Sequence, residues 1–172
     1  PPELAHQIKD GKVKIVISLS DLAGALAKMP EVPPSLKSVI VTGSADFLTR
    51  APFECPDIKG VDVLTYLGLT DPAKETFEQK DVHWNDTFMI QYTGGTTGKP
   101  KGAMLSHRNV LHNTAQTTSI NEWVEGEETI ISAFPMFHIA GLSNALSTAR
   151  FGGLFVLISN PRDTDFICQQ IK

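Results

Sequence analysis

The first fifty residues alternate between two kinds of hydrophobic spacing. Leu4 and Ile8 stand four residues apart, as on one face of a helix, whereas the β-branched run from Val13 to Ile17 is typical of a strand. In order, the pattern predicts a helix over 3–10, a strand over 13–17, a helix that Ser20 or Asp21 caps and Pro30 stops, and a strand over 39–41. This order predicts an α/β fold with a layered, largely parallel sheet flanked by helices.

Residues 45–87 lack a clear period. Prolines and scattered acidic residues mark most of this stretch as loop. A short helix over 61–67 and another over 73–79 are the regular elements that we expect there.

Regular hydrophobic spacing returns at Thr87. In order, the pattern predicts a strand over 87–92, a short strand over 103–105, a helix over 107–117 capped by Ser106, a strand over 128–134, a helix over 141–151, a strand over 154–158 and a last helix that Asp163 or Thr164 opens. Val110, Leu111 and Ala115 are expected to face inward. The run 154–158 is continuously apolar, so we expect that strand to be buried on both faces.

Composition narrows the class of protein. The net charge of −4 over 172 residues argues against a nucleic-acid-binding domain, which usually carries a basic excess. Cys55 and Cys168 have no metal-ligand spacing and are expected to be reduced thiols of a cytosolic protein. No apolar stretch approaches the roughly 20 residues that a transmembrane helix needs.

The densest chemical signal is a Gly/Thr loop from Tyr92 to Gly102, with the sequence YTGGTTGKPKG. Its glycines allow a tight turn, and consecutive backbone N–H groups in such a loop form a concave nest for phosphate oxygens. Threonine hydroxyls and two lysines add further donors, and no carboxylate interrupts the run. The loop therefore predicts a polyphosphate site.

The loop has two alternative interpretations, a surface linker and a Walker-A motif. A flexible surface linker is also rich in Gly and Thr, but this loop is framed closely by two predicted strands. A Walker-A motif does not fit, because Pro100 follows Lys99 and Thr93 stands where the first glycine belongs. The loop is a phosphate loop of another type.

The segment 92–102, continued through Ala103 to Asn109, resembles the signature of the adenylate-forming superfamily. This superfamily includes acyl-CoA synthetases, luciferases and the adenylation domains of peptide synthetases. Gly94, where the superfamily usually has Ser, gives a Gly-Gly pair that is similar to the long-chain fatty-acid–CoA ligases of bacteria. The segments 134–141 and 160–163 are similar to the family's aromatic-His segment and to the fatty-acyl ligases, respectively.

The resemblance implies a two-step reaction of a longer enzyme. ATP and a fatty acid give an acyl-adenylate and pyrophosphate, and the thiol of CoA then displaces AMP. The expected cofactors and substrates are therefore ATP, Mg²⁺, CoA and a fatty acid. Fixed donors and Mg²⁺ must offset the repulsion between carboxylate and triphosphate.

By resemblance, one set of residues is assigned to ATP. These residues are Tyr92, Thr93, Gly94, Gly95, Thr96, Thr97, Gly98, Lys101 and Gly102. Lys101 is expected to act as a mobile catalytic cation, and Thr93 to help hold Mg²⁺, although one hydroxyl cannot make a metal site alone. Lys99 fits a solvated surface position at least as well.

His138 is the second catalytic candidate. A lone His among apolar side chains is most often a satisfied core histidine. The resemblance instead places it at the mouth of the acyl pocket, near the carboxylate, and we favour this placement. Met136 and Phe137 fit either core packing or pocket wall, and His6, His107 and Arg108 are expected on surface helices.

The resemblance further implies that residues 1–172 are part of the large N-terminal AMP-binding domain, and that the C-terminal domain is absent. We expect the piece alone to be inactive. Two alternatives remain: an adenylation domain for an amino or aryl acid, and a non-catalytic nucleotide-binding module. Because long-chain acids partition into bilayers, we expect a cytoplasmic parent with peripheral contact at the inner face of the membrane.

Overall fold

The computed structural model describes residues 2–46, 48, 52–70, 78–94 and 99–171. The chain forms two compact units, which we call the first unit (Pro1–Asp81 with Tyr92–Ala103) and the second unit (Val82–Gln91 with Met104–Lys172). Most of the helix predicted over 73–79 lies outside the described residues.

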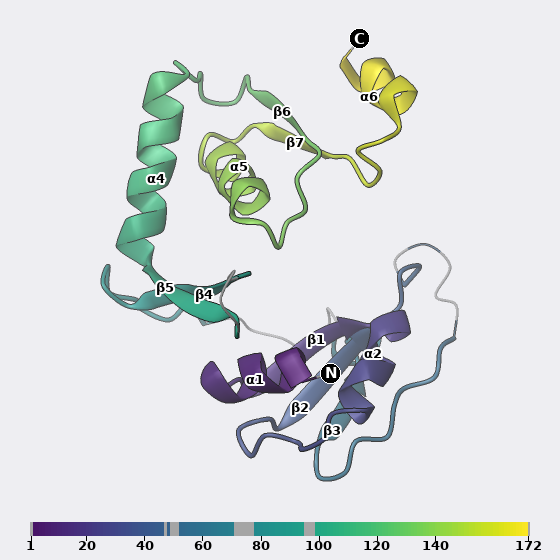
Figure 1. The fold of residues 1–172 in the computed structure, drawn as a ribbon. Coiled ribbons are helices and arrows are strands. Elements are labelled where there is room, and N and C mark those ends of the chain that lie inside the picture. The colour runs from purple at the N-terminus through teal and green to yellow at the C-terminus, as the bar shows by residue number, and fades with distance from the viewer. Residues whose placement is uncertain (1, 47, 49–51, 71–77, 95–98, 172) are drawn as a thin grey trace. The chain divides into compact units, whose positions relative to one another are not determined.

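The first unit is built around a parallel sheet (Figure 1). Its elements are α1 (Pro2–Asp10), β1 (Ile15–Leu19), α2 (Ser20–Ala27), β2 (Ser38–Thr42), β3 (Asp62–Thr65) and α3 (Tyr66–Leu69). The strands lie in the order β1-β2-β3, with Ile17 opposite Ile40 and Ile40 opposite Leu64. Parallel pairing follows from the alternation of strands and helices that the sequence predicted.

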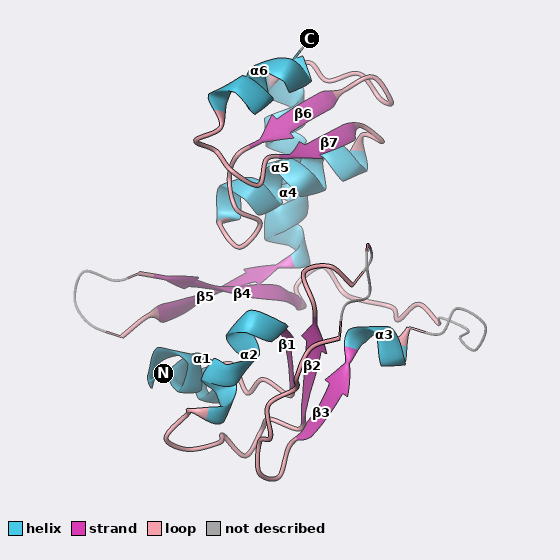
Figure 2. Ribbon diagram, turned by 90° about the vertical axis from the view of Figure 1, so that its right-hand side faces the viewer, coloured by secondary structure: helices cyan, strands magenta, loops and turns pink. Residues whose placement is uncertain are grey.

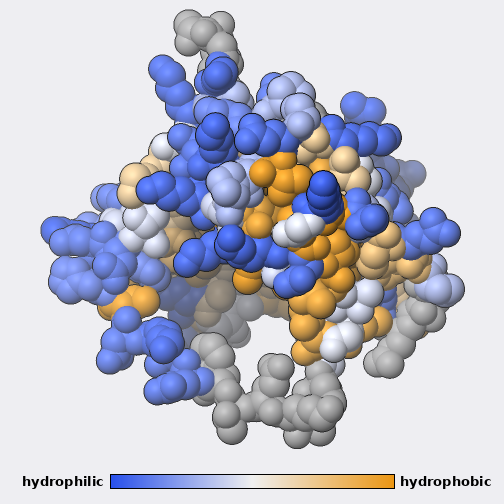
Figure 3. Space-filling model, turned by 90° about the horizontal axis from the view of Figure 1, so that it is seen from below, coloured by the Kyte–Doolittle hydropathy of each residue, from blue (hydrophilic) through white to orange (hydrophobic). Residues whose placement is uncertain are grey.

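One face of this sheet carries the core of the first unit. Val39 and Val41 of β2 are fully buried, and Leu26 of α2 and Ile8 of α1 pack with them. Figure 2 shows α1 and α2 on this side of the strands. On the opposite face Ile17 is 64% exposed. Figure 3 shows a continuous orange, hydrophobic area on the face that is seen from below.

The second unit has its own parallel pair of strands. Its elements are α4 (His107–Ile120), β6 (Thr129–Ser132), α5 (Ile139–Arg150), β7 (Leu154–Leu157) and α6 (Thr164–Ile171). β6 and β7 pair in parallel, with Thr129 opposite Leu154. A further two-stranded sheet, formed by β4 (Thr87–Thr93) and β5 (Lys101–Ser106), has residues in both units.

The α/β prediction with parallel pairing is confirmed, and so are the predicted start signals of α4 and α6. The Ser106 side chain accepts a hydrogen bond from the Asn109 backbone N–H, and the Asn109 side chain returns one to Ser106, which makes a capping box at α4. Asp163 caps α6 by accepting from the Phe166 N–H at 3.0 Å. Gly152 follows α5 with φ +65°, a conformation that favours glycine.

Two predictions about elements are wrong. The segment 61–67 is mostly strand, because Val63 and its neighbours pair with β2, and the helix begins only at Tyr66. β7 is not buried on both faces: Leu154 and Leu157 are 61% and 60% exposed. Among the described residues β7 pairs with β6 alone, and the sheets are three small ones.

Smaller details of two helices also differ from the predictions. Neither Ser20 nor Asp21 caps α2, because Leu19 occupies the N-cap position and the Ser20 hydroxyl is 3.3 Å from the Asp21 carboxylate. In α4, Leu111 is 47% exposed, whereas Thr114 is buried. The Thr114 hydroxyl donates a hydrogen bond to the Val110 carbonyl oxygen at 3.0 Å, so a polar side chain can occupy the inward face of α4.

Candidate functional site

Strands β4 and β5 place the two ends of the Gly/Thr loop. Of the residues predicted to bind ATP, the structure describes Tyr92, Thr93 and Gly94 at the end of β4, and Lys101 and Gly102 at the start of β5. Gly95, Thr96, Thr97 and Gly98 lie outside the described residues.

The two ends of the loop meet across the strand pair. The Thr93 hydroxyl is 3.4 Å from the Lys101 carbonyl oxygen, a long hydrogen bond that leaves this hydroxyl suited to a stronger partner. A Cβ atom added at Gly94 would meet no other atom within 4 Å, so there is open space in front of its backbone. Both observations fit a loop that receives a ligand.

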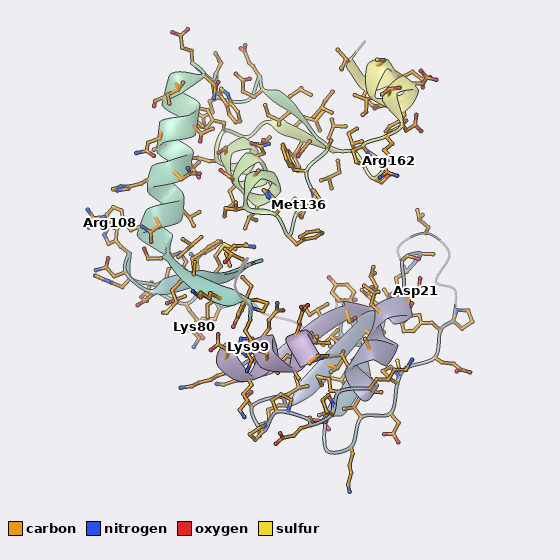
Figure 4. The ribbon with its side chains drawn as sticks, viewed as in Figure 1. Asp21, Lys80, Lys99, Arg108, Met136 and Arg162 are labelled. Atoms are coloured by element: carbon orange, nitrogen blue, oxygen red, sulfur yellow. The ribbon has the colours of Figure 1, made fainter. Side chains whose placement is uncertain are left out.

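An open groove lies beside the loop in the first unit. It is lined by His6, Asp10, Lys99, Pro100, Lys101 and Gly102. Lys99 and Lys101 are exposed, and Figure 4 shows the labelled Lys99 beside α1. The two ammonium groups can attract a polyanion, and Asp10 is the one acidic side chain in this lining. Lys99, expected at the surface, therefore shares the groove with Lys101.

Helix α1 contacts both ends of the loop. The Tyr92 hydroxyl donates to the Asp10 carboxylate at 2.7 Å, and His6 Nε2 is 3.2 Å from the Pro100 carbonyl oxygen. Desolvation raises the pKa of Tyr92, and the hydrogen bond and the negative charge of Asp10 raise it further. The phenol thus stays a donor at neutral pH.

Sequence reasoning did not identify His6 or Asp10 as site residues. His6 was expected on a surface helix, but it is partly buried beside the loop. The two contacts join residues that are 82 and 94 positions apart in the sequence. Neither α1 nor the loop carries a local signal for such long-range pairing.

His138 begins helix α5 in the second unit. It is exposed, and its Nδ1 accepts a hydrogen bond from the Ala140 backbone N–H at 3.1 Å. Its ring stacks on that of Phe134, with centroids 5.7 Å apart. The core-histidine interpretation is therefore wrong. In the neutral ring, an accepting Nδ1 leaves the proton on Nε2, which can donate to a carboxylate.

The segment before His138 is held by backbone contacts rather than by burial. Met136 and Phe137 are 43% and 82% exposed, so neither is a core residue of the second unit (Figure 4 labels Met136). The Gln91 side-chain amide donates to the Phe137 carbonyl at 3.1 Å. Gly141 packs so closely on this segment that an added Cβ would lie 2.8 Å from the Phe134 carbonyl oxygen and nearer still to that of Pro135.

An apolar cavity of about 220 Å³ lies in the second unit, between α4 and α5. Its apolar wall includes Met89, Leu105, Val110, Ile139, Leu142 and Leu146. Its polar wall includes Ser143, whose hydroxyl donates to the Asn113 side-chain oxygen at 2.7 Å. Such a lining suits an uncharged, largely apolar group.

The described residues show neither a cluster of metal ligands nor a membrane-spanning helix. They contain no group of three or more His, Cys, Asp or Glu side chains that could hold a metal ion. Thr93 offers one hydroxyl oxygen, and its role at Mg²⁺ stays a prediction. None of the helices formed by these residues is both long and apolar enough to cross a membrane.

Comparisons with known proteins agree over the whole chain. Residues 1–172 match the family described as AMP-binding enzyme. The long-chain-fatty-acid–CoA ligase of Salmonella typhimurium is 33% identical, over 99% of this chain and 33% of the relative. The 4-coumarate–CoA ligase-like 8 of Arabidopsis thaliana is 30% identical, over 91% of this chain and 26% of the relative. This chain therefore spans about a third of the length of the curated relatives.

A solved structure gives the same result. Apo MatB from Rhodopseudomonas palustris superposes with a TM-score of 0.72 at 27% identity, over 98% of this chain and 30% of that chain. The resemblance that the sequence predicted is confirmed at the level of the family.

Proposed function

Because this chain belongs to the family of AMP-binding enzymes, we propose that it is part of an ATP-dependent ligase that converts a fatty acid to acyl-adenylate and then to acyl-CoA. The observation that carries the proposal is the groove beside the Gly/Thr loop. There, Lys99 and Lys101 line an open groove together with Gly102 of the same loop.

The groove suits the charge of the reacting groups. When the carboxylate oxygen attacks the α-phosphorus of ATP, negative charge moves onto the departing pyrophosphate. Donors that are already in place at that position lower the barrier without reorganising. We assign this role to Lys101 and to backbone N–H groups of the loop, and we assign the Thr93 hydroxyl as one ligand of the Mg²⁺ that ATP carries.

The residues that we assign to the acid substrate belong to the second unit. His138 presents Nε2–H from the start of α5, and the cavity between α4 and α5 offers an apolar lining. We assign the acid carboxylate to His138 and part of the acyl pocket to this unit. The name of the Salmonella relative supports a long-chain acid as substrate and CoA as the final acceptor.

An aryl or amino acid is the second candidate substrate. The Arabidopsis relative, named as 4-coumarate–CoA ligase-like, favours an aryl acid. An exchange assay with fatty, aryl and amino acids distinguishes these candidate substrates.

Exchange of labelled pyrophosphate into ATP tests the proposal in the full-length enzyme that carries this sequence. We expect exchange that depends on a fatty acid and rises with chain length, and weaker exchange with aryl or amino acids. Dependence on an aryl acid alone would assign the second candidate. ATP binding without exchange for any acid would contradict the ligase proposal and leave a nucleotide-binding module.

Two lysine variants provide the matched comparison. Lys101→Ala is expected to lower exchange by roughly 100-fold, the usual effect of removing one donor from a developing negative charge. Lys80→Ala removes the same charge from an exposed position outside the groove and is expected to retain exchange. Equal losses in both variants would show that Lys101 acts only through net charge.

A further inference from the structure

Helix α1 holds the Gly/Thr loop at both of its ends. His6 and Asp10 are four residues apart and so lie on the same face of this nine-residue helix. Asp10 binds Tyr92, the first residue of the loop, and His6 binds Pro100, two residues before the loop ends at Gly102. All four residues belong to the first unit.

The chemistry of both contacts fixes their direction. A carbonyl oxygen only accepts, so the His6 ring must donate to Pro100. The Tyr92 hydroxyl has one proton, and its 2.7 Å contact with the carboxylate is shorter than its 3.4 Å approach to the Gln7 carbonyl. Hydrogen bonds to an ionised group are stronger than neutral ones, so the Asp10 contact dominates.

Asp10 is poorly suited to contact a nucleotide itself. Its carboxylate lines the same groove as Lys99 and Lys101, where it would repel phosphate oxygens. Its bond to Tyr92 gives it a different role.

We propose that Asp10 and His6 are positioning residues, which act through Tyr92 and Pro100 to hold Thr93, Gly94 and Lys101 in place for the phosphates of ATP. This inference rests on the proposed function. Donors that are held in advance lose less conformational freedom on binding, and this advantage benefits the ligand that they contact. Loss of the α1 contacts therefore weakens the binding of ATP more than the binding of the acid.

The experiment uses four variants at Asp10 and Tyr92 of the full-length enzyme: Asp10→Ala, Asp10→Asn, Tyr92→Phe and the Asp10→Ala/Tyr92→Phe double variant. We expect Asp10→Ala and Tyr92→Phe each to raise the KM and the Kd for ATP about three- to tenfold, as loss of one solvent-exposed hydrogen bond predicts. The KM for the acid stays unchanged. Asp10→Asn keeps an acceptor and loses less.

The double variant separates positioning from general damage. If both residues act through one hydrogen bond, the double variant is no worse than the worse single variant. Glu3→Gln removes an exposed acid from the same helix and serves as the control with unchanged KM for ATP. His6→Gln retains a side-chain donor and is expected to lose less ATP affinity than His6→Ala.

The outcomes are distinct. Additive losses, an unchanged Kd for ATP in Asp10→Ala, or parallel rises in both KM values with a lowered Tm would overturn the positioning role. Calorimetric Kd values for ATP test it even where no acid supports exchange. A wild-type enzyme that binds ATP without exchange would therefore contradict the proposed function while the Asp10 and Tyr92 variants still decide this inference.

Discussion

The His138 imidazole uses its two nitrogens differently. Nδ1 accepts from the Ala140 N–H and so caps α5, while Nε2 is assigned to the acid carboxylate. These functions can be separated, because an Asn side chain also caps a helix N-terminus but does not extend a donor to the position of Nε2.

The first prediction therefore compares His138→Asn with His138→Ala. We expect the Ala variant to lose about 1 kcal/mol of unfolding free energy, the usual cost of a lost N-cap, and the Asn variant to lose little. Both should show reduced acid-dependent pyrophosphate exchange. Urea denaturation measures the first effect. If Asn restored exchange along with stability, capping alone would account for His138.

The second prediction concerns Tyr92 and pH. Its pKa is raised in the folded protein by desolvation, followed by the Asp10 hydrogen bond and charge. The native state thus binds this proton more tightly than the unfolded state, so the contribution to stability is complete below the unfolded pKa of about 10 and is lost as pH rises through the folded pKa.

Unfolding curves for the wild type and for Tyr92→Phe at pH 8 and above pH 10 measure this effect. The stability advantage of the wild type over the variant should shrink at the higher pH. A constant difference across this range would show that the Tyr92 hydroxyl does not titrate with folding.

At the scale of elements, α5 and α2 each contain a glycine in a helix but in opposite surroundings. A methyl group at Gly141 would collide with the carbonyls of Phe134 and Pro135, whereas one at Gly24 would meet no atom within 4 Å. Gly24→Ala is expected to stabilise by about 0.4–1 kcal/mol, because alanine restricts the unfolded chain.

For Gly141→Ala we expect a loss of about 1–3 kcal/mol, the cost of overpacking a tight contact. Thermal unfolding of both variants checks this third prediction. Equal and small effects in the two variants would show that the segment before α5 yields easily.

Elements with local signals were the ones that the sequence predicted well. Ser106 and Asp163 act through their own neighbours, and each marks the start of the helix that it was expected to begin. β3 was missed because its strand conformation depends on β2, more than twenty residues earlier in the chain. The exposure of β7 was missed for the same reason, since burial depends on what lies beside a strand and not on its own apolar run.

Some residues of the candidate site were likewise predicted from the local sequence, and others were not. The loop between Tyr92 and Gly102 was identified from consecutive residues, as was His138. The contribution of α1 to the loop depends on contacts across more than eighty positions, and periodicity within the helix does not encode its partner.

At the scale of the whole molecule, the relevant feature is the length of the chain. It spans about a third of the length of its curated relatives. The fourth prediction is that the 172-residue chain forms no acyl-CoA from ATP, fatty acid and CoA. Mass spectrometry of the products tests this, with a Lys101→Ala/Thr96→Ala variant as the background. Product above that background would contradict this prediction.

The close packing of Gly141 also has a consequence for protein engineering. A randomised library that aims at new acid preference should keep this glycine fixed, because every larger residue must first displace the Phe134–Pro135 backbone. Diversity belongs instead at Leu142, Ser143 and Leu146, which line the cavity on the same helix. Variants recovered from such a library would therefore differ in the volume and polarity of the cavity wall that α5 forms, while the backbone at the start of α5 stays unchanged.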